Sequence, residues 1–329
     1  IVDDAGRRLA GFGTRVMTEL TGGRYVTLQR SGLSRVLFEK INATAEIIFD
    51  DEIVELHEEA DCVAVELKHA RARRFDLVIG ADGLHSIVRK IAFGPRPAFE
   101  KHLGYVVAAL EVRGYRPRDP DVYVIYNRPG RMVGRFTLRD DRTLFLFVFA
   151  SANMPLPTTL DLQKAMLRDA YGQAKWECPH ILDAVDRAEE LYFDRVSQIM
   201  MQGWSRGRIA LIGDAAFCVS LLAGQGSALA MVSAYVLAGE LADARGGHQM
   251  AFARYEALLR DHIATKQRGA ERFAGVMAPK TRAGLYVRNQ VIKAFEIPGL
   301  ARWTFGRDIV DALRLPDYNW PSLDQIVAR

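Results

Sequence analysis

Cysteine is scarce in this chain, and the few cysteines that occur are far apart. Only three, Cys62, Cys178 and Cys218, stand among 329 residues, and no Cys-x-x-Cys pair is present. An odd number at such spacing excludes a disulfide-stapled scaffold and a cysteine-based zinc site, so no metal is expected. A reducing compartment fits best, and we expect a cytoplasmic protein.

The sequence also lacks a long apolar run and a strong charge of either sign. The longest apolar candidate, Ala228–Leu241, is interrupted by Ser233, Gly239 and Glu240, and a membrane helix needs roughly 20 apolar residues. Lys and Arg number 44 against 40 Asp and Glu. No basic run is interleaved with aromatic residues. We therefore expect neither a membrane span nor a nucleic-acid partner.

What is present is an ordinary globular composition, with 49% apolar and 26% charged residues. The length suggests about two domains. The chain begins with Ile1 rather than Met, and no signal-peptide pattern follows. We interpret it as a piece of a longer protein.

Two short apolar segments, Asp76–Gly80 and Arg208–Gly213, read as buried strands of a parallel sheet, and each leads through a glycine-containing turn into a helix. Residues 1–31 read as loop and short strands, and further strands are expected at Ala45–Phe49, Ile53–Leu56 and Cys62–Leu67. Helices are expected at Leu33–Ile41, Leu160–Tyr171, His180–Glu189 and over most of the chain from about Ser227 to Leu313.

Four β-rich runs separated by turn residues predict an antiparallel sheet between these two strands. They are Tyr105–Val112, Val122–Tyr126, Met132–Leu138 and Thr143–Ala150. This sheet is a candidate second domain.

The segment Gly207–Ala216 predicts a ligand-binding turn, because it delivers Asp214 to the carboxyl end of a strand, where ligands bind in open α/β sheets. A carboxylate there can accept hydrogen bonds from ribityl or ribose hydroxyls. The loop Ala223–Ser227 then opens a helix, where glycines allow close approach of a flat ligand and the first N–H groups favour negative charge. A reduced flavin carries such a charge at N1/C2=O, although a tight turn without a ligand explains Gly-Gln-Gly equally well.

Two more segments carry polar residues at the start of a helix. Asp82 and Arg89 lie in the segment Asp76–Arg89, where Asp82 is either a ligand contact or a helix N-cap. Arg30 precedes the helix from Leu33, where it is either a clamp for a phosphate or flavin edge or a surface residue.

Together, in order and spacing, these segments resemble the flavoprotein monooxygenases of the p-hydroxybenzoate hydroxylase type. Arg30–Leu33 is similar to the family's Arg-x-x-Leu element, and Gly80–Arg89 contains its Gly-Ala-Asp-Gly-x-x-Ser-x-Val-Arg motif in full. Gly213–Ala216 with Gly224–Gly226 is similar to its Gly-Asp motif. The resemblance covers nearly the whole chain and extends to Tyr255-Glu256 with Arg260.

The resemblance implies FAD as cofactor, NAD(P)H as reductant and a flavin C4a-hydroperoxide that hydroxylates an aromatic or polyketide-like small molecule. Asp214 would bind the ribityl side of FAD, Arg30 its ribityl–pyrophosphate part, and the Gly224–Gly226 loop its isoalloxazine, while Asp82 and Arg89 would serve the passage of FAD and the nicotinamide. No catalytic residue is assigned, because the cofactor carries out the chemistry. The implied cofactor-binding set is Arg30, Asp82, Gly83, Arg89, Gly213, Asp214, Gly224, Gln225, Gly226 and Ser227.

The implied fold is α/β. A Rossmann-like FAD-binding domain would comprise residues 1–100 and 190–270, an inserted antiparallel-sheet substrate domain residues 101–189, and a C-terminal helical segment residues 271–329. Its N-terminal βαβ unit is missing. Gly11-Phe-Gly13 lacks a third glycine, follows no buried strand and enters no helical pattern.

Two single-residue departures from the family pattern also occur. Phe217 stands where the family has His, and Leu221 stands where it has Pro.

Other interpretations remain open. The alternative from a different class is a catalytically silent remnant or interaction protein that binds FAD weakly or not at all. A halogenase of the same fold is disfavoured because no Trp-x-Trp-x-Ile-Pro element occurs, and the reductase branch of the fold is not excluded. The apolar stretch Leu285–Phe295 packs either on the core or on a second copy, as in a homodimer.

Overall fold

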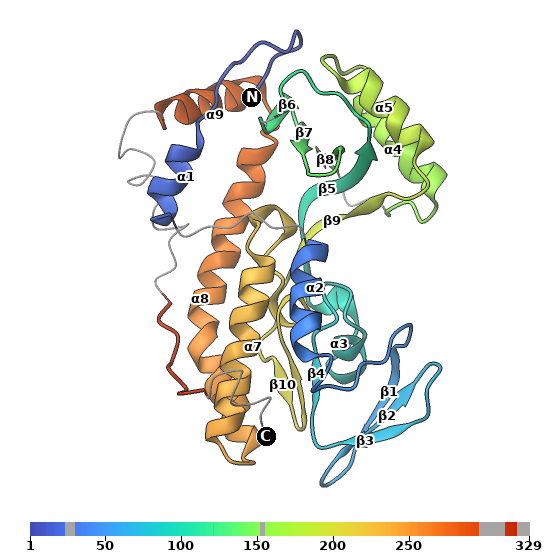
Figure 1. Ribbon diagram of the computed structural model, residues 1–329, viewed down its shortest axis with the longest axis vertical. Coiled ribbons are helices and arrows are strands. Elements are labelled where there is room, and N and C mark those ends of the chain that lie inside the picture. The colour runs from blue at the N-terminus through green and yellow to red at the C-terminus, as the bar shows by residue number, and fades with distance from the viewer. Residues whose placement is uncertain (24–29, 121, 152–154, 296–312, 321–329) are drawn as a thin grey trace.

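The computed structural model describes residues 1–23, 30–120, 122–151, 155–295 and 313–320. Two sheet-containing regions lie one above the other along the long axis, and the helices α7 (Gly226–Asp243) and α8 (His248–Met277) run along that axis (Figure 1). α8 reaches the upper region, where the main-chain N–H of Gly130 donates to the carbonyl oxygen of Pro279, just beyond the end of α8 (2.7 Å).

The lower region is built on the predicted parallel pair. Strand β4 (Val78–Gly80) pairs in parallel with β11 (Ile209–Leu211), and β10 (Ser205–Arg206) lies antiparallel on the other side of β11. All three residues of β11 are buried, as a strand covered on both faces should be. Residues of this pair share one apolar core with α7 and α8.

A small antiparallel sheet packs beside helix α3 (Ile87–Ala92) in the same region. It consists of β1 (Ile53–Glu58), β2 (Val63–Leu67) and β3 (Arg73–Phe75) in that order. The strand expected at Ala45–Phe49 does not form, because Ile48 and Phe49 are exposed and pair with no neighbouring strand in the described residues.

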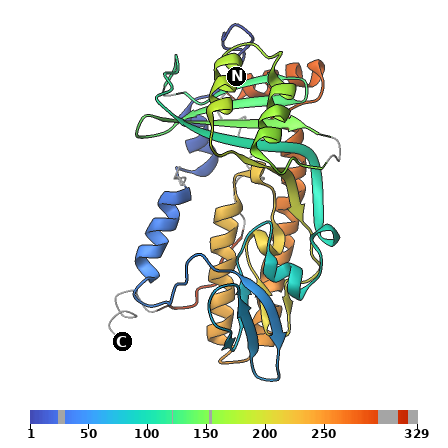
Figure 2. The same ribbon diagram turned by 90° about the vertical axis from the view of Figure 1, so that its right-hand side faces the viewer.

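The upper region is a five-stranded antiparallel sheet in the order β6-β7-β8-β5-β9, which confirms the four predicted β-runs. β9 pairs with the long strand β5 and was not predicted, because polar residues interrupt its sequence. Helices α4 (Leu160–Tyr171) and α5 (Cys178–Arg187) cover one face (Figures 1 and 2). The strands are β5 (Glu100–Arg113), β6 (Val124–Arg128), β7 (Arg131–Thr137), β8 (Arg142–Ala150) and β9 (Tyr192–Ile199).

Three further long helices are α1 (Thr14–Thr21), α2 (Arg30–Ile41) and α9 (Arg282–Ala294), and the short elements are the helix α6 (Asp214–Phe217) and the 3-10 turns η1 (Arg96–Ala98) and η2 (Leu221–Ala223). The loop expected over residues 1–31 is therefore wrong in part, since α1 follows directly on Gly13. Residues 296–312 of the predicted C-terminal helices and residues 321–329 lie outside the described residues. Among the helices that are described, none combines the length and apolar character needed to cross a bilayer.

Candidate functional site

The carboxyl ends of β4 and β11 lie side by side, with Gly80 opposite Leu211 in the parallel register. A Cβ atom on Gly80 would lie 2.6 Å from the Leu211 side chain, so only glycine allows this approach. Gly213, just beyond β11, has φ +57°, and a Cβ there would lie 2.9 Å from Cβ of Ala230 on α7. The two glycines therefore bring both strand ends and α7 together.

Asp214 begins the short helix α6 (Asp214–Phe217) and is half-buried. Its carboxylate faces the first residue of α7, since a Cβ atom on Gly226 would lie 3.5 Å from Oδ1 of Asp214. Burial raises the pKa of the neighbouring Cys218 thiol to about 12, and the Asp214 carboxylate adds to this shift. The thiol is thus held neutral beside a carboxylate at the strand end.

The start of α7 is open. The preceding 3-10 turn, η2 (Leu221–Ala223), ends at Gly224, which has φ +67° and no heavy atom within 4 Å of a Cβ position. Gln225 makes no side-chain cap, and no acidic residue lies in the first turn of this 18-residue helix. Gly224 and Ser227 are exposed. The first N–H groups of α7 therefore present partial positive charge where a flat, electron-rich ligand can approach.

The two departures from the family pattern lie at the end of α6 and at the start of η2. Phe217 is buried against Trp204, with ring centroids 4.6 Å apart, so the aromatic ring fills the core. Leu221 packs with its buried neighbour Leu222 against the five-stranded sheet. Ser220 has φ +128°, a strained conformation that is held because the segment is buried, and such strain is common at functional sites.

Just beyond β4, the Asp82 carboxylate accepts hydrogen bonds from the start of helix α3. Its Oδ1 accepts a hydrogen bond from Ser86 Oγ (2.5 Å), and its Oδ2 accepts from the main-chain N–H groups of Ile87 (2.7 Å) and Val88 (3.1 Å). Gly83, the residue after Asp82, has φ +81°. The N-cap residue of α3 is Ser86, whose Oγ accepts from the main-chain N–H of Arg89 (2.9 Å), so Asp82 supports the start of the helix without being its N-cap.

The Arg89 side chain connects the turn after β4 to helix α6. It is 1% exposed, and its Nη1 and Nη2 donate to the carbonyl oxygens of Ala215 (2.8 Å) and Leu84 (2.6 Å). Its Nε is buried with no partner among the described residues. Burial lowers the pKa of this guanidinium. Arg89 therefore positions α6 relative to the turn after β4.

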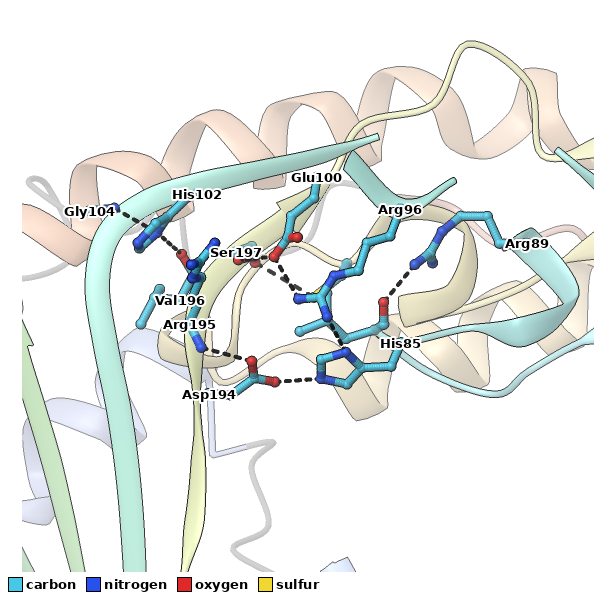
Figure 3. Close-up of polar contacts among 12 residues, drawn as sticks. His85, Arg89, Arg96, Glu100, His102, Gly104, Asp194, Arg195, Val196 and Ser197 are labelled. Carbon is cyan, nitrogen blue, oxygen red and sulfur yellow. Dashed lines mark hydrogen bonds and ion pairs between the residues drawn. The ribbon is translucent and has the colours of Figure 1, made fainter. Parts of the chain in front are cut away.

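A polar network that the sequence did not predict links the turn after β4 to the five-stranded sheet (Figure 3). His85 Nε2 lies 2.7 Å from Oδ2 of Asp194 on β9, and Arg96 contacts Nδ1 of the same ring. The His85 ring is thereby held between a carboxylate on β9 and a guanidinium that follows α3.

The network continues through Glu100 on β5. Arg96 Nη2 and Ser197 Oγ each donate to Glu100 Oε1 (2.6 Å). Burial acts to raise the pKa of Glu100, but the hydrogen bonds from Arg96 and Ser197 outweigh it and leave this pKa below its ordinary value. The only sequence signal for the network was His85, inside the Gly80–Arg89 motif.

The sheet face opposite α4 and α5 is apolar and lies against η2. Leu222 is packed in one cluster with this face and with the end of α8. Ile125, Phe136 and Leu146 are only partly buried, so this apolar surface stays accessible next to the loop that precedes α7. The buried members on the sheet are Tyr105, Val107, Met132, Val148 and Val196.

The structure thus brings together Gly213, Asp214 and the Gly224–Ser227 loop, and it sets the Asp82–Arg89 turn at the adjacent strand end. Arg30 is the first residue of α2, but its side chain lies outside the described residues.

Comparison with known proteins gives three findings on sequence. The chain matches the family model described as FAD binding domain over residues 7–263. An uncharacterized protein of Mycobacterium tuberculosis is 38% identical over 235 residues, which are 70% of this chain and 63% of the relative. A flavin-dependent monooxygenase of Legionella longbeachae is 34% identical over 249 residues, which are 74% of this chain and 62% of the relative. The chain therefore spans less than two thirds of the length of these relatives.

Among solved structures, the tetracycline destructase Tet(55) is similar to this chain with a TM-score of 0.73 at 29% identity. The match covers 88% of this chain and 74% of that protein.

Proposed function

Because the chain belongs to the FAD-binding domain family of the flavin-dependent monooxygenases, we propose that it forms the greater part of an FAD-dependent monooxygenase. The proposed reaction hydroxylates an aromatic or polyketide-like small molecule with NAD(P)H and O2. In this proposal, residues 1–100 and 190–270 form the FAD-binding domain, and residues 101–189 form the substrate-binding domain. Residues 271–329 form a C-terminal helical segment.

The observation that carries the proposal is the half-buried carboxylate of Asp214 facing the open start of α7. The residues present fit the flavin end of FAD. Asp214 would accept hydrogen bonds from the ribityl hydroxyls. Gly224 leaves room for a flat ring because no atom lies near its Cβ position. The first N–H groups of α7 would face the N1/C2=O edge.

Each element of the chain then has a defined task. The α7 dipole stabilises negative charge at its N-terminus. The apolar face around Ile125, Phe136 and Leu146 would orient an aromatic substrate and keep water away. When bound, FAD would take hydride from NAD(P)H and use O2 to oxygenate the substrate, so no acid–base pair from the chain is required.

Replacing Asp214 tests this assignment. We expect Asp214→Ala to weaken FAD binding at least tenfold, because the carboxylate that would bind the ribityl chain is removed. Binding is measured by flavin fluorescence titration, with circular dichroism to check that the fold is intact. The matched control is Asp243→Ala, an exposed carboxylate at the far end of α7. Equal FAD affinity in both variants would overturn the assignment.

A second candidate is a protein of the same fold that binds FAD weakly and has no oxygenase activity. It is favoured by one observation: no described residues form the strand–Gly-x-Gly–helix unit that holds the ADP part of FAD in this family. The purified chain distinguishes the two. A yellow protein that oxidises NADPH faster with a phenolic ligand supports the monooxygenase, whereas a colourless protein that FAD does not stabilise supports the second candidate.

A further inference from the structure

A cavity of about 260 Å³ lies on the side of the five-stranded sheet that faces away from η2. It opens between the β6–β7 hairpin and the end of α4, on the face that α4 and α5 cover. It is therefore separate from the proposed flavin site. Its lining residues are Tyr126, Arg128, Pro129, Arg131, Ala170, Tyr171, Gln173 and Ala174.

Two arginines meet at this cavity. Arg128 and Arg131 are direct partners in the antiparallel register of β6 and β7, so their side chains lie on the same face of the sheet. Like charges placed directly opposite each other across two strands are destabilising unless something offsets them.

Only one of the two charges is offset within the described residues. Arg128 donates to the hydroxyl of Tyr126 (2.9 Å) and forms an ion pair with Asp4 (3.2 Å). No carboxylate in the described chain lies within ion-pair distance of Arg131, which is exposed. The mouth of the cavity therefore carries one uncompensated positive charge.

The floor of the cavity is apolar. Tyr126 and Tyr171 are each 2% exposed, and Ala170 and Ala174 lie beside them. Both tyrosine hydroxyls already have partners, because Tyr126 donates to Asp4 (2.7 Å) and Tyr171 bonds to the carbonyl oxygens of Met132 (3.0 Å) and Val148 (2.9 Å). Because both rings are almost fully covered, what remains for a ligand is mainly the methyl surface of Ala170 and Ala174 below a cation.

We propose that this cavity binds a small organic carboxylate. Arg131 forms an ion pair with the carboxylate, and the apolar body of the ligand lies against Tyr126, Ala170 and Ala174. The volume fits a molecule of about one ring, because drug-sized ligands occupy sites of roughly 300–1,000 Å³. Bound there, the carboxylate also removes the repulsion between the two arginines of the hairpin.

Calorimetric titration of the whole chain with benzoate tests the proposal, with neutral benzamide as the isosteric comparison. We expect benzoate to bind at least tenfold more tightly than benzamide, and Arg131→Gln to remove that preference. Arg139→Gln, which replaces an exposed arginine in the turn between β7 and β8, should leave it unchanged. Equal binding of the two compounds, no benzoate binding, or an Arg131→Gln variant that binds benzoate normally would each overturn the proposal.

A second variant separates this cavity from the substrate surface on the other face of the sheet. Ala174→Trp fills the cavity, so it should abolish benzoate binding while leaving the affinity for FAD unchanged. Circular dichroism checks the fold of this variant. Benzoate that still binds to Ala174→Trp lies elsewhere on the protein, and the proposal then fails whatever the outcome for the flavin site.

Discussion

The five-stranded sheet and the three-stranded sheet of β10, β11 and β4 differ in how their strands are paired. Every neighbouring pair in the larger sheet is antiparallel, whereas β4 and β11 are parallel. The candidate site lies at the carboxyl ends of this parallel pair.

The difference follows from how each sheet is assembled. Neighbours in the order β6-β7-β8 are joined by short turns, so most of their pairing is local. β4 and β11 are parallel and about 130 residues apart, and parallel pairs always need a long crossover connection. We infer that the smaller sheet opens at lower free energy than the larger one.

The largest effect is expected from Arg89, which fixes the geometry of the smaller sheet. Arg89→Ala leaves the carbonyl oxygens of Leu84 and Ala215 without their charged donor, so we expect a loss of about 4 kcal/mol in unfolding free energy. Denaturant unfolding measures it, with the exposed neighbour Lys90→Ala as the control. Hydrogen exchange should quicken at β11 and stay slow at β8. A uniform increase over both sheets would contradict the inferred difference between them.

A smaller effect is expected from Gly80, where the two parallel strands approach. Gly80→Ala forces a methyl group to within 2.6 Å of Leu211 and 2.9 Å of Val88, and such overpacking costs about 1–3 kcal/mol. The control is Gly269→Ala, because no atom lies within 4 Å of that position and alanine favours the helix. If Gly80→Ala unfolds at the same denaturant concentration as the wild type, the side chains of Leu211 and Val88 can move aside, and the close approach of the strand ends does not require glycine.

The sequence predicted the parts of the fold that depend on neighbouring residues. Continuous apolar runs bounded by glycine identified β4 and β11, and Asp214 was correctly expected just beyond the carboxyl end of the second strand. The hairpins of the larger sheet followed from their turn residues.

What the sequence could not predict depends on distant partners. β9 has little apolar pattern of its own and is defined by its pairing with β5. The full burial of Arg89 requires a carbonyl oxygen 126 residues away, and the link from His85 requires Asp194, which is 109 residues away. α1 was missed because only Gly13 marks its start, and that residue makes no side-chain cap.

The smallest effect is expected on helix α2, which lies at one side of the lower region (Figure 2) and exposes apolar side chains. Val36 is 50% and Leu37 47% exposed, so replacing both with serine should change the unfolding free energy by no more than about 0.5 kcal/mol. Fluorescence of a dye that binds apolar surface should nevertheless fall, because Val36 and Leu37 are two of four exposed apolar side chains on this helix, with Phe38 and Ile41.

The control for this prediction comes from the larger sheet. Leu162 on α4 is 57% exposed, so Leu162→Ser removes one apolar side chain of similar exposure from a helix that covers this sheet. A single exposed leucine is ordinary on a protein surface, so dye fluorescence should not change. If Leu162→Ser lowers the fluorescence as much as the α2 variant does, then the dye does not distinguish the apolar side chains of α2 from a single exposed leucine elsewhere on the protein.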